Sequence, residues 1–239
     1  MPIECSHDKR NRLHRISRRE FLKQTSTAAA GLLIGTSSAQ GANATLALIN
    51  GKLIDGTGAD VVPNGGVVIQ NGRILVAGPQ TQVKVPAGAK IIDVQGRTIL
   101  PGFINAHVHT AYSAWKLKSW AKGGVTTVRD LCAYGPYTRA RFVTRDTLNA
   151  NLKCARLFAV GSFINVKGGY PIAYWRGHAV TITSPEGARR AVNRLIDDGA
   201  DVIKTAVDSG YAFGQSGWSL PSPEEAKALV DTAHERGEY

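Results

Sequence analysis

Short apolar runs separated by turn residues occupy the chain between residues 45 and 100. The runs cover residues 46–49, 67–69, 74–77 and 91–94, and an Asn-Gly pair follows each of the first two. Asn-Gly between apolar runs is a strong signal for a β-hairpin. The pattern predicts a small all-β unit of about 55 residues, which is too short to bury much core alone. We therefore expect it to pack against the segment that follows.

After residue 101, apolar strands alternate with helical segments. Apolar runs at residues 103–107, 125–128, 156–163 and 202–207 predict four strands. Strands that alternate with helices are typical of a parallel sheet with right-handed crossovers. Eight such units in a closed barrel take about 250 residues. The pattern therefore predicts the first half of a (β/α)8 barrel.

Two of the helices have clear start and stop signals. Each helix is preceded by a Ser-Pro pair, at residues 184–185 and 222–223. We expect each serine to be the N-cap and each proline to be the first residue of the helix. The second of these segments also has the spacing of a capping box. Apolar residues then recur at helical spacing until Gly199 and Gly237, which mark the two ends. A weaker helix is predicted around Phe142.

The formal net charge of +11 raises the question of a nucleic-acid partner. Residues 1–23 hold seven Lys or Arg and three acidic residues, a net charge of +4. The remaining 22 basic and 15 acidic residues are scattered without a dense run. A nucleic-acid site needs a clustered basic stripe or a stacking motif, so we expect no nucleic-acid partner.

Residues 1–44 have the order of an export signal. Arg18 and Arg19 lie in a Ser-Arg-Arg-Glu-Phe-Leu-Lys segment that resembles a twin-arginine signal. Residues 25–35 are modestly apolar and too short for a stable membrane span, and residues 42–44 fit an A-x-A cleavage site. We expect a twin-arginine signal peptide, the translocation machinery as a partner, and a periplasmic or extracellular mature protein. The alternative interpretation is a basic tail that contains two arginines.

The cysteines do not predict a disulfide or a thiolate metal site. Cys5 lies in the leader, and Cys132 and Cys154 are expected at opposite ends of neighbouring strands, too far apart for a bond. The sequence contains no C-x-x-C motif.

His107 and His109 are the first candidates for chemistry. Residues two apart on a strand point to the same side, so both would project into the barrel at its C-terminal mouth, where such barrels place active sites. We expect the strand that leads to them to be buried. Two converging imidazoles are natural ligands for zinc or a similar divalent ion. A His-x-His pattern also arises by chance, but the apolar strand and the Pro-Gly pair before it favour the metal site.

Lys204 is the second candidate, because it lies inside an apolar run. Burial would lower the pKa of its amine. A neutral amine can add carbon dioxide, and the resulting carbamate can bridge two metal ions about 3.5–4 Å apart. The alternative is a lysine whose stem packs and whose ammonium group reaches water. The residue type alone does not decide between them.

Other residues near the same predicted end of the sheet have two interpretations each. The Arg-Asp pair at residues 129–130 could shape the site or form a local ion pair. The loop that holds Tyr170, Arg176 and His178 could bind substrate, since loops at this face carry function, or its aromatic residues could simply pack. We interpret His234, beside the apolar stripe of the last helix, as structural or exposed to solvent.

Four motifs occur in order between residue 46 and the end of the chain. They are Leu53-Ile54-Asp55-Gly56-Thr57-Gly58, Pro101-Gly102-Phe103-Ile104 with His107-Val108-His109, Gly124-Val125-Thr126-Thr127-Val128-Arg129-Asp130, and Gly199-Ala200-Asp201-Val202-Ile203-Lys204. Together they resemble the signatures of the metal-dependent amidohydrolase superfamily, and its imidazolonepropionase-like and prolidase-like branch is most similar.

The resemblance implies an α/β fold class with an N-terminal small β-sandwich and the first half of a (β/α)8 TIM-type barrel. The sandwich would comprise residues 45–100 and would be completed by a missing C-terminus. The half-barrel would comprise residues 101–239. On this interpretation the chain is truncated.

The resemblance also implies roles for the candidate residues. His107 and His109 would be the metal ligands of the first strand, and Lys204 would be the carboxylated bridging lysine of the fourth. In that family a metal-bound hydroxide attacks a carbonyl carbon. Histidines from the fifth and sixth strands complete the metal sphere, and an aspartate after the eighth strand transfers the proton. Those three residues lie beyond the chain end, so the sequence assigns no catalytic residue here and we expect this chain alone to be inactive.

The sequence therefore predicts a hydrolase of carbon–nitrogen bonds in amides, cyclic amides or dipeptide-like small molecules. Its cofactor would be one or two divalent ions, zinc foremost, with a carbon-dioxide-derived carbamate on Lys204. The alternatives are a non-catalytic truncated half-barrel and a binding module of the cell envelope. Two copies could close one barrel, so a homo-oligomer is a further alternative. The sequence does not name the substrate or the metal.

Overall fold

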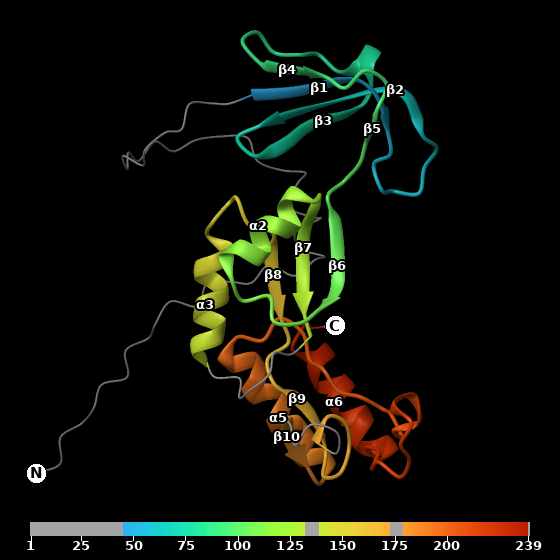
Figure 1. Ribbon diagram of the computed structural model, residues 1–239, viewed down its shortest axis with the longest axis vertical. Coiled ribbons are helices and arrows are strands. Elements are labelled where there is room, and N and C mark those ends of the chain that lie inside the picture. Colours follow the sequence, from blue (N-terminus) through green and yellow to red (C-terminus); the bar gives the residue numbers. More distant parts are fainter. Residues whose placement is uncertain (1–44, 132–138, 173–178, 239) are drawn as a thin grey trace, which may run out of the picture. The chain divides into compact units, whose positions relative to one another are not determined.

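The structure is a computed structural model that describes residues 45–131, 139–172 and 179–238 (Figure 1). The predicted leader, Cys5 and Cys132 lie outside the described residues. Strands come first along the chain, and strands alternating with helices follow. None of the helices in the described part of the chain has the length and apolar character needed to cross a membrane.

The first strands form one five-stranded sheet. β1 (Thr45–Leu53) pairs antiparallel with β2 (Val62–Gln70), which pairs antiparallel with β3 (Arg73–Pro79). On its other side β1 pairs in parallel with β4 (Lys90–Asp93) and β5 (Thr98–Ile99). A short 3-10 turn, η2 (Gln80–Gln82), follows β3. Small apolar clusters pack on the two faces of the sheet; one contains Ala47, Val68 and Val83, and the other Leu53, Val67 and Ile99.

The predicted β-sandwich is not seen in the described residues. β4 and β5 extend the sheet along β1 instead of forming a second layer over it. Apolar side chains of this unit, including Ile74, Leu75 and Ile91, are consequently exposed. The all-β character was predicted correctly, and a second layer, predicted to come from polypeptide outside this chain, stays a prediction.

The two Asn-Gly pairs have different roles. Asn71 and Gly72, with φ of 52° and 73°, form the predicted hairpin turn between β2 and β3. The prediction of a second turn at Asn50 and Gly51 is wrong, because β1 continues through both residues with a shift in its pairing register. Asn50 has a φ of 59°, and a Cβ on Gly51 would lie 2.7 Å from the side chain of Ile99. Here the pair forms a bulge within a strand.

The alternation of strands and helices predicted after residue 101 is confirmed. β6 (Phe103–Val108), β7 (Val125–Asp130) and β8 (Arg156–Ala159) form a parallel sheet in that order. α2 (Ala114–Lys122) and α3 (Arg139–Asn149) connect them, and the three arrows in Figure 1 point the same way. Leu117 of α2 packs with Val108, Val128 and Leu157 of the three strands. The carboxyl ends of the strands therefore share one edge, where His107 and Asp130 lie.

The third predicted strand is divided at Gly161. β8 ends at Ala159, and the chain continues as β9 (Phe163–Val166), which pairs in parallel with β10 (Ala179–Ile182). Gly161 has a φ of 75°, and a Cβ there would lie 2.9 Å from the ring of Phe142 on α3. Both the backbone conformation and the close approach of α3 require glycine.

The fourth predicted strand, residues 202–207, is not a regular strand in the structure. Single backbone hydrogen bonds align it with its neighbours: the amide of Asp201 donates to Ala159 O (2.8 Å), and that of Ile164 donates to Lys204 O (3.0 Å). The segment therefore runs beside β8 and β9 without a continuous ladder.

Two capped helices complete the described part. α5 (Pro185–Asp198) begins at Ser184, whose Oγ accepts from the amide of Gly187, and it ends at Gly199. A short turn, η3 (Tyr211–Phe213), precedes α6 (Pro223–Glu235), where Ser222 and Glu225 form the predicted capping box. The apolar faces of both helices pack into one core cluster with Phe142, Ala159, Ile164 and Ile182.

Candidate metal centre

His107 and His109 lie on the same side of the chain at the end of β6. Their Nε2 atoms are 3.2 Å apart, and their ring centroids are 5.2 Å apart with the planes inclined by 60°. Val108, between them, points the opposite way into the core. The alternation expected of a strand is therefore present. The prediction of a buried strand is wrong, because Phe103 and Ile104 are 59% and 68% exposed, and the described residues leave the start of β6 uncovered.

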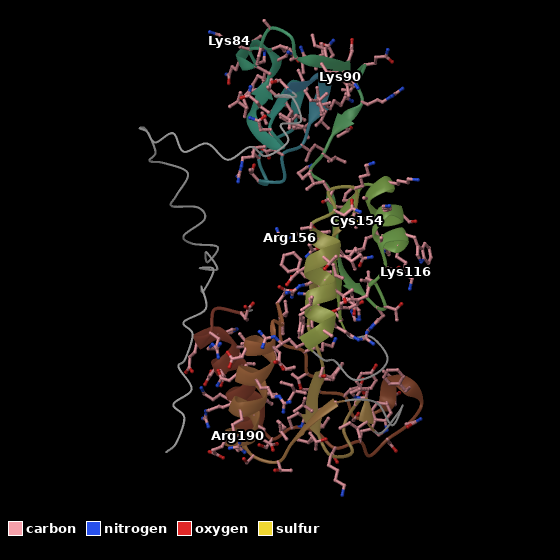
Figure 2. All side chains as sticks on the ribbon, turned by 90° about the vertical axis from the view of Figure 1, so that its left-hand side faces the viewer. Lys84, Lys90, Lys116, Cys154, Arg156 and Arg190 are labelled. Carbon is pink, nitrogen blue, oxygen red and sulfur yellow. The ribbon has the colours of Figure 1, made fainter. Side chains whose placement is uncertain are left out.

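The turn that follows His109 is held from two sides. Thr110 has a φ of 58°. The carboxylate of Asp130, fully buried at the end of β7, accepts a 2.7 Å hydrogen bond from the amide of Ala111. Lys116 of α2, labelled in Figure 2, donates from Nζ to both the carbonyl and the hydroxyl oxygen of Thr110, at 2.8 and 3.0 Å. The position of His109 thus depends on two residues from neighbouring elements.

Lys204 lies in the same electrostatic neighbourhood as His107. The pKa of His107 lies below its ordinary value, first because the ring is partly desolvated and then because Lys204, His109 and Arg129 are cationic neighbours. The Nζ of Lys204, which is half-buried, lies 5.5 Å from the centroid of the Phe163 ring. The two histidines are therefore in contact, and Lys204 lies within electrostatic range of His107.

Arg129 and Asp130, at the end of β7, contact different parts of the chain. Arg129 Nε donates to the carbonyl oxygen of Ala106 at 2.8 Å, which ties β7 to β6 just before His107. Asp130 points instead to Ala111. Both residues therefore support the backbone that carries the histidines, a role that the sequence left open.

The geometry of the two imidazoles fits a shared metal ion. Zinc binds histidine nitrogen at about 2.0–2.1 Å with tetrahedral angles, which places two nitrogens about 3.3 Å apart. The observed separation of the Nε2 atoms is 3.2 Å. A direct hydrogen bond, in which the protonated Nε2 of one ring donates to the unprotonated Nε2 of the other, would give a similar distance. Within the described residues, no group of three or more His, Cys, Asp or Glu side chains is placed to hold a metal, so the third nearby candidate is Lys204.

The remaining candidates include the three residues predicted to bind substrate. Tyr170 is in contact with three other aromatic rings, and Arg176 and His178 lie outside the described residues. His234 is exposed and lines a small apolar cavity of about 100 Å³ between α6 and residues 203–205, which agrees with the interpretation of a structural or solvent-exposed residue. Cys154 is a free thiol.

One buried polar residue was missed by the sequence reasoning. Asn165, only 1% exposed in β9, donates from Nδ2 to the carbonyl oxygens of Tyr170 (2.5 Å) and Ala206 (3.2 Å). It therefore joins the loop after β9 to the segment that carries Lys204. An asparagine within an apolar run is the signal that could have identified it, since a buried amide needs partners.

The chain is similar to several proteins of known name. An imidazolonepropionase of Symbiobacterium thermophilum is 28% identical over 128 residues, which are 48% of this chain and 30% of that protein. An enamidase of Eubacterium barkeri is 25% identical over 197 residues, which are 78% of this chain and 46% of that protein. A crystal structure of a prolidase complexed with N-methylphosphonate-L-proline is 26% identical with a TM-score of 0.64, covering 82% of this chain and 55% of that chain. No protein-family model matches the chain.

These similarities support the amidohydrolase superfamily predicted from the four motifs, together with its mixed α/β fold. The chain spans less than half the length of the two named relatives and about half of the prolidase structure.

Proposed function

We propose that this chain contributes the first part of a metal-dependent hydrolase that acts on carbon–nitrogen bonds, with His107, His109 and Lys204 as its metal-binding residues. The observation that carries the proposal is the 3.2 Å separation of the two Nε2 atoms, with Lys204 as a cationic neighbour of His107. The similarity to an enamidase and an imidazolonepropionase supports the reaction class. Small amides, cyclic amides or dipeptide-like molecules are the proposed substrates.

The residues of this chain would hold the ion and orient it. Neutral imidazole is the form that binds metal, and the lowered pKa of His107 favours that form near neutral pH. Asp130 and Lys116 fix the turn at Thr110 and thereby the direction of the His109 ring. A bound divalent ion, for which zinc is the first choice, would supply Lewis acidity toward a carbonyl group and acidify a water.

Lys204 would act as a carbamate. Its neutral amine adds carbon dioxide, forming an N–C bond and releasing one proton, and the two carbamate oxygens then serve as anionic ligands. The half-buried position of Lys204 and its place as an electrostatic neighbour of His107 support this role. The remaining metal ligands and the general base would come from polypeptide outside these residues.

Export by the twin-arginine route is part of the proposal. It rests on Arg18 and Arg19 and on the order of basic, apolar and small residues in the first 44 positions. Replacing both arginines by lysine should retain the protein in the cytoplasm, as cell fractionation would show. Export of the double variant at the normal level would contradict this part of the proposal.

Metal analysis of the purified chain tests the site. In His107→Ala, His109→Ala and Lys204→Ala we expect the affinity for divalent ions to fall by at least about tenfold. Even changes to residues that only support metal ligands cause a loss of that size. His234→Ala is the matched control, because His234 lies at the cavity on α6. Circular dichroism would establish that each variant is folded. Unchanged affinity in folded His107→Ala and Lys204→Ala proteins would refute the site.

The exposed start of β6 favours a second candidate function. Phe103 and Ile104 present apolar surface that a closed barrel would bury, so the chain could act as a non-catalytic half-barrel or an envelope binding module. This candidate predicts no specific uptake of metal. The same metal measurement therefore separates it from the hydrolase.

A further inference from the structure

The loop after Lys204 exposes an unusual amount of apolar surface. Tyr211 is 86% exposed and Phe213 is 40% exposed, and Val207 and Leu220 at the ends of the loop are also exposed. Singly exposed apolar residues are common, but a contiguous group on one loop marks a contact surface. The loop follows in sequence the segment that carries Lys204, a proposed metal ligand.

Aromatic contacts connect this loop to Lys204. Tyr170 stacks on Phe213, with centroids 5.3 Å apart and planes inclined by 19°, and on Trp218 at 5.8 Å and 29°. The edge of Phe163 meets Tyr170 at 5.5 Å, and the Nζ of Lys204 lies 5.5 Å from the Phe163 ring. A continuous series of rings therefore leads from the candidate metal centre to the exposed ring of Phe213. We call Tyr170, Phe213 and Trp218 the aromatic wall.

The aromatic wall is held in place by its own polar contacts. Trp218 is 8% exposed, and its indole nitrogen donates to Gln215 Oε1 at 3.0 Å. The amide of Ser219 donates to Gly168 O at 3.0 Å, which joins the loop to the turn before Tyr170. Buried Asn165 fixes the other side by donating to Tyr170 O and Ala206 O. The rings therefore stand in place before any ligand arrives, which reduces the entropy lost on binding.

This arrangement differs from a loop that packs its aromatic residues only for stability. Such packing would cover Phe213 as it covers Trp218, yet Phe213 and Tyr211 remain open to solvent. Rigid ring faces beside a few polar groups are the usual lining of a small-molecule site. Flat apolar groups stack on such faces in offset or edge-to-face geometry.

We propose that the aromatic wall is a substrate subsite that binds an aromatic ring, or a similarly flat apolar substituent, of the substrate. The inference rests on the proposed hydrolase function and names the substrate class of that site. It assigns recognition to Tyr170 and Phe213, with Trp218 supporting them from behind. Substrates with a small or charged substituent at this position gain little from the wall.

Binding of two matched amides tests the subsite without any need for catalysis. The probes are N-acetyl-L-phenylalanine amide and N-acetyl-L-alanine amide, added to the full-length chain and followed by saturation-transfer NMR with titration. We expect the phenylalanine probe to bind about three- to tenfold more tightly, the range for one added aromatic contact. Phe213→Ala should remove most of that preference. Trp115→Ala is the control, because Trp115 is an exposed aromatic residue on α2, outside the aromatic wall.

The outcomes separate this inference from the proposed function. Equal binding of the two probes, or an equal loss of preference in Phe213→Ala and Trp115→Ala, would overturn the subsite. Neither result depends on metal. If the chain takes up metal through His107 but does not discriminate between the probes, the subsite is wrong and the hydrolase proposal stands. Discrimination that Phe213→Ala abolishes supports the subsite even where metal uptake fails.

Discussion

The fully buried carboxylate of Asp130 accepts a 2.7 Å hydrogen bond from the amide of Ala111, two residues after His109. This contact joins the end of β7 to the turn that leaves β6. The backbone carbonyl of Asp130 also accepts from the amide of Val160, so the residue connects three consecutive β/α units. The Asp130 side chain therefore helps to orient His109.

Asp130→Ala should lower both stability and metal affinity. Removing the acceptor leaves the amide of Ala111 without its partner, which costs about 1–3 kcal/mol for a buried group. Urea denaturation would measure this loss. Metal affinity should fall by about tenfold or more, as outer-sphere changes do. Asp231→Ala, which breaks an exposed pair with Lys227 on α6, is the control and should change stability by less than about 1 kcal/mol. Equal effects of the two variants would show that Asp130 has no special structural role.

The pair of Arg145 and Asp201 supports the segment that carries Lys204. Arg145 is 5% exposed, and its Nη1 lies 2.6 Å both from Asp201 Oδ2 and from the carbonyl oxygen of Gly199. Asp201 Oδ2 also accepts from the amide of Ala159. α3 is thereby joined to the start of the segment.

Arg145→Met should destabilise the fold by about 3–5 kcal/mol, because it leaves the Asp201 carboxylate without its cation. Arg189→Met provides the comparison, since Arg189 pairs with Glu186 at 3.6 Å on the exposed side of α5 and should change stability by less than about 1 kcal/mol. Thermal and urea unfolding would measure both. A loss in Arg145→Met no greater than that in Arg189→Met would contradict the role of the pair.

Sequence patterns predicted the elements with strong local signals. The caps at Ser184 and Ser222, the hairpin at Asn71 and the alternation after residue 101 all depend on neighbouring residues, and the structure has each of them. The grouping of His107 with His109 followed from strand alternation alone, because a period of two fixes the side to which each residue points.

The predictions that failed depended on contacts distant in sequence. Whether Asn50 makes a turn or a bulge is decided by the approach of Ile99 to Gly51. The burial of β6 was predicted from its apolar residues, but burial also needs a neighbour to cover them. The positioning role of Asp130 could not be assigned, since nothing local indicates that its partner is Ala111.

Ser222→Ala should destabilise the last helix by about 1 kcal/mol. The serine hydroxyl accepts from the amide of Glu225 at 3.1 Å, and the Glu225 carboxylate accepts from the amide of Ser222 at 2.9 Å. Loss of the hydroxyl removes one of these two bonds. Chemical denaturation and amide hydrogen exchange at the first turn of α6 would report the change. Unchanged protection of the Glu225 amide would show that the capping box does not form in solution.

The pKa of His107 provides a direct test of its proximity to Lys204. Desolvation, and then the positive charges of Lys204, His109 and Arg129, hold this pKa below the ordinary value of 6.5. Since the folded-state pKa is lowered, the unfolded chain binds the proton more readily. The contribution of His107 to stability is therefore full above about pH 6.5 and is lost as the pH falls through the folded-state pKa.

Lys204→Met removes one of the positive charges, so the pKa of His107 should rise toward 6.5 and the acid-induced loss of stability should become smaller. Metal-free NMR titration of the imidazole signals, assigned with His107→Gln, would measure the shift, and Lys118→Met on the exposed side of α2 should leave it unchanged. An unaltered titration of His107 in Lys204→Met would mean that the two side chains are not neighbours, and Lys204 would then be removed from the proposed set of ligands.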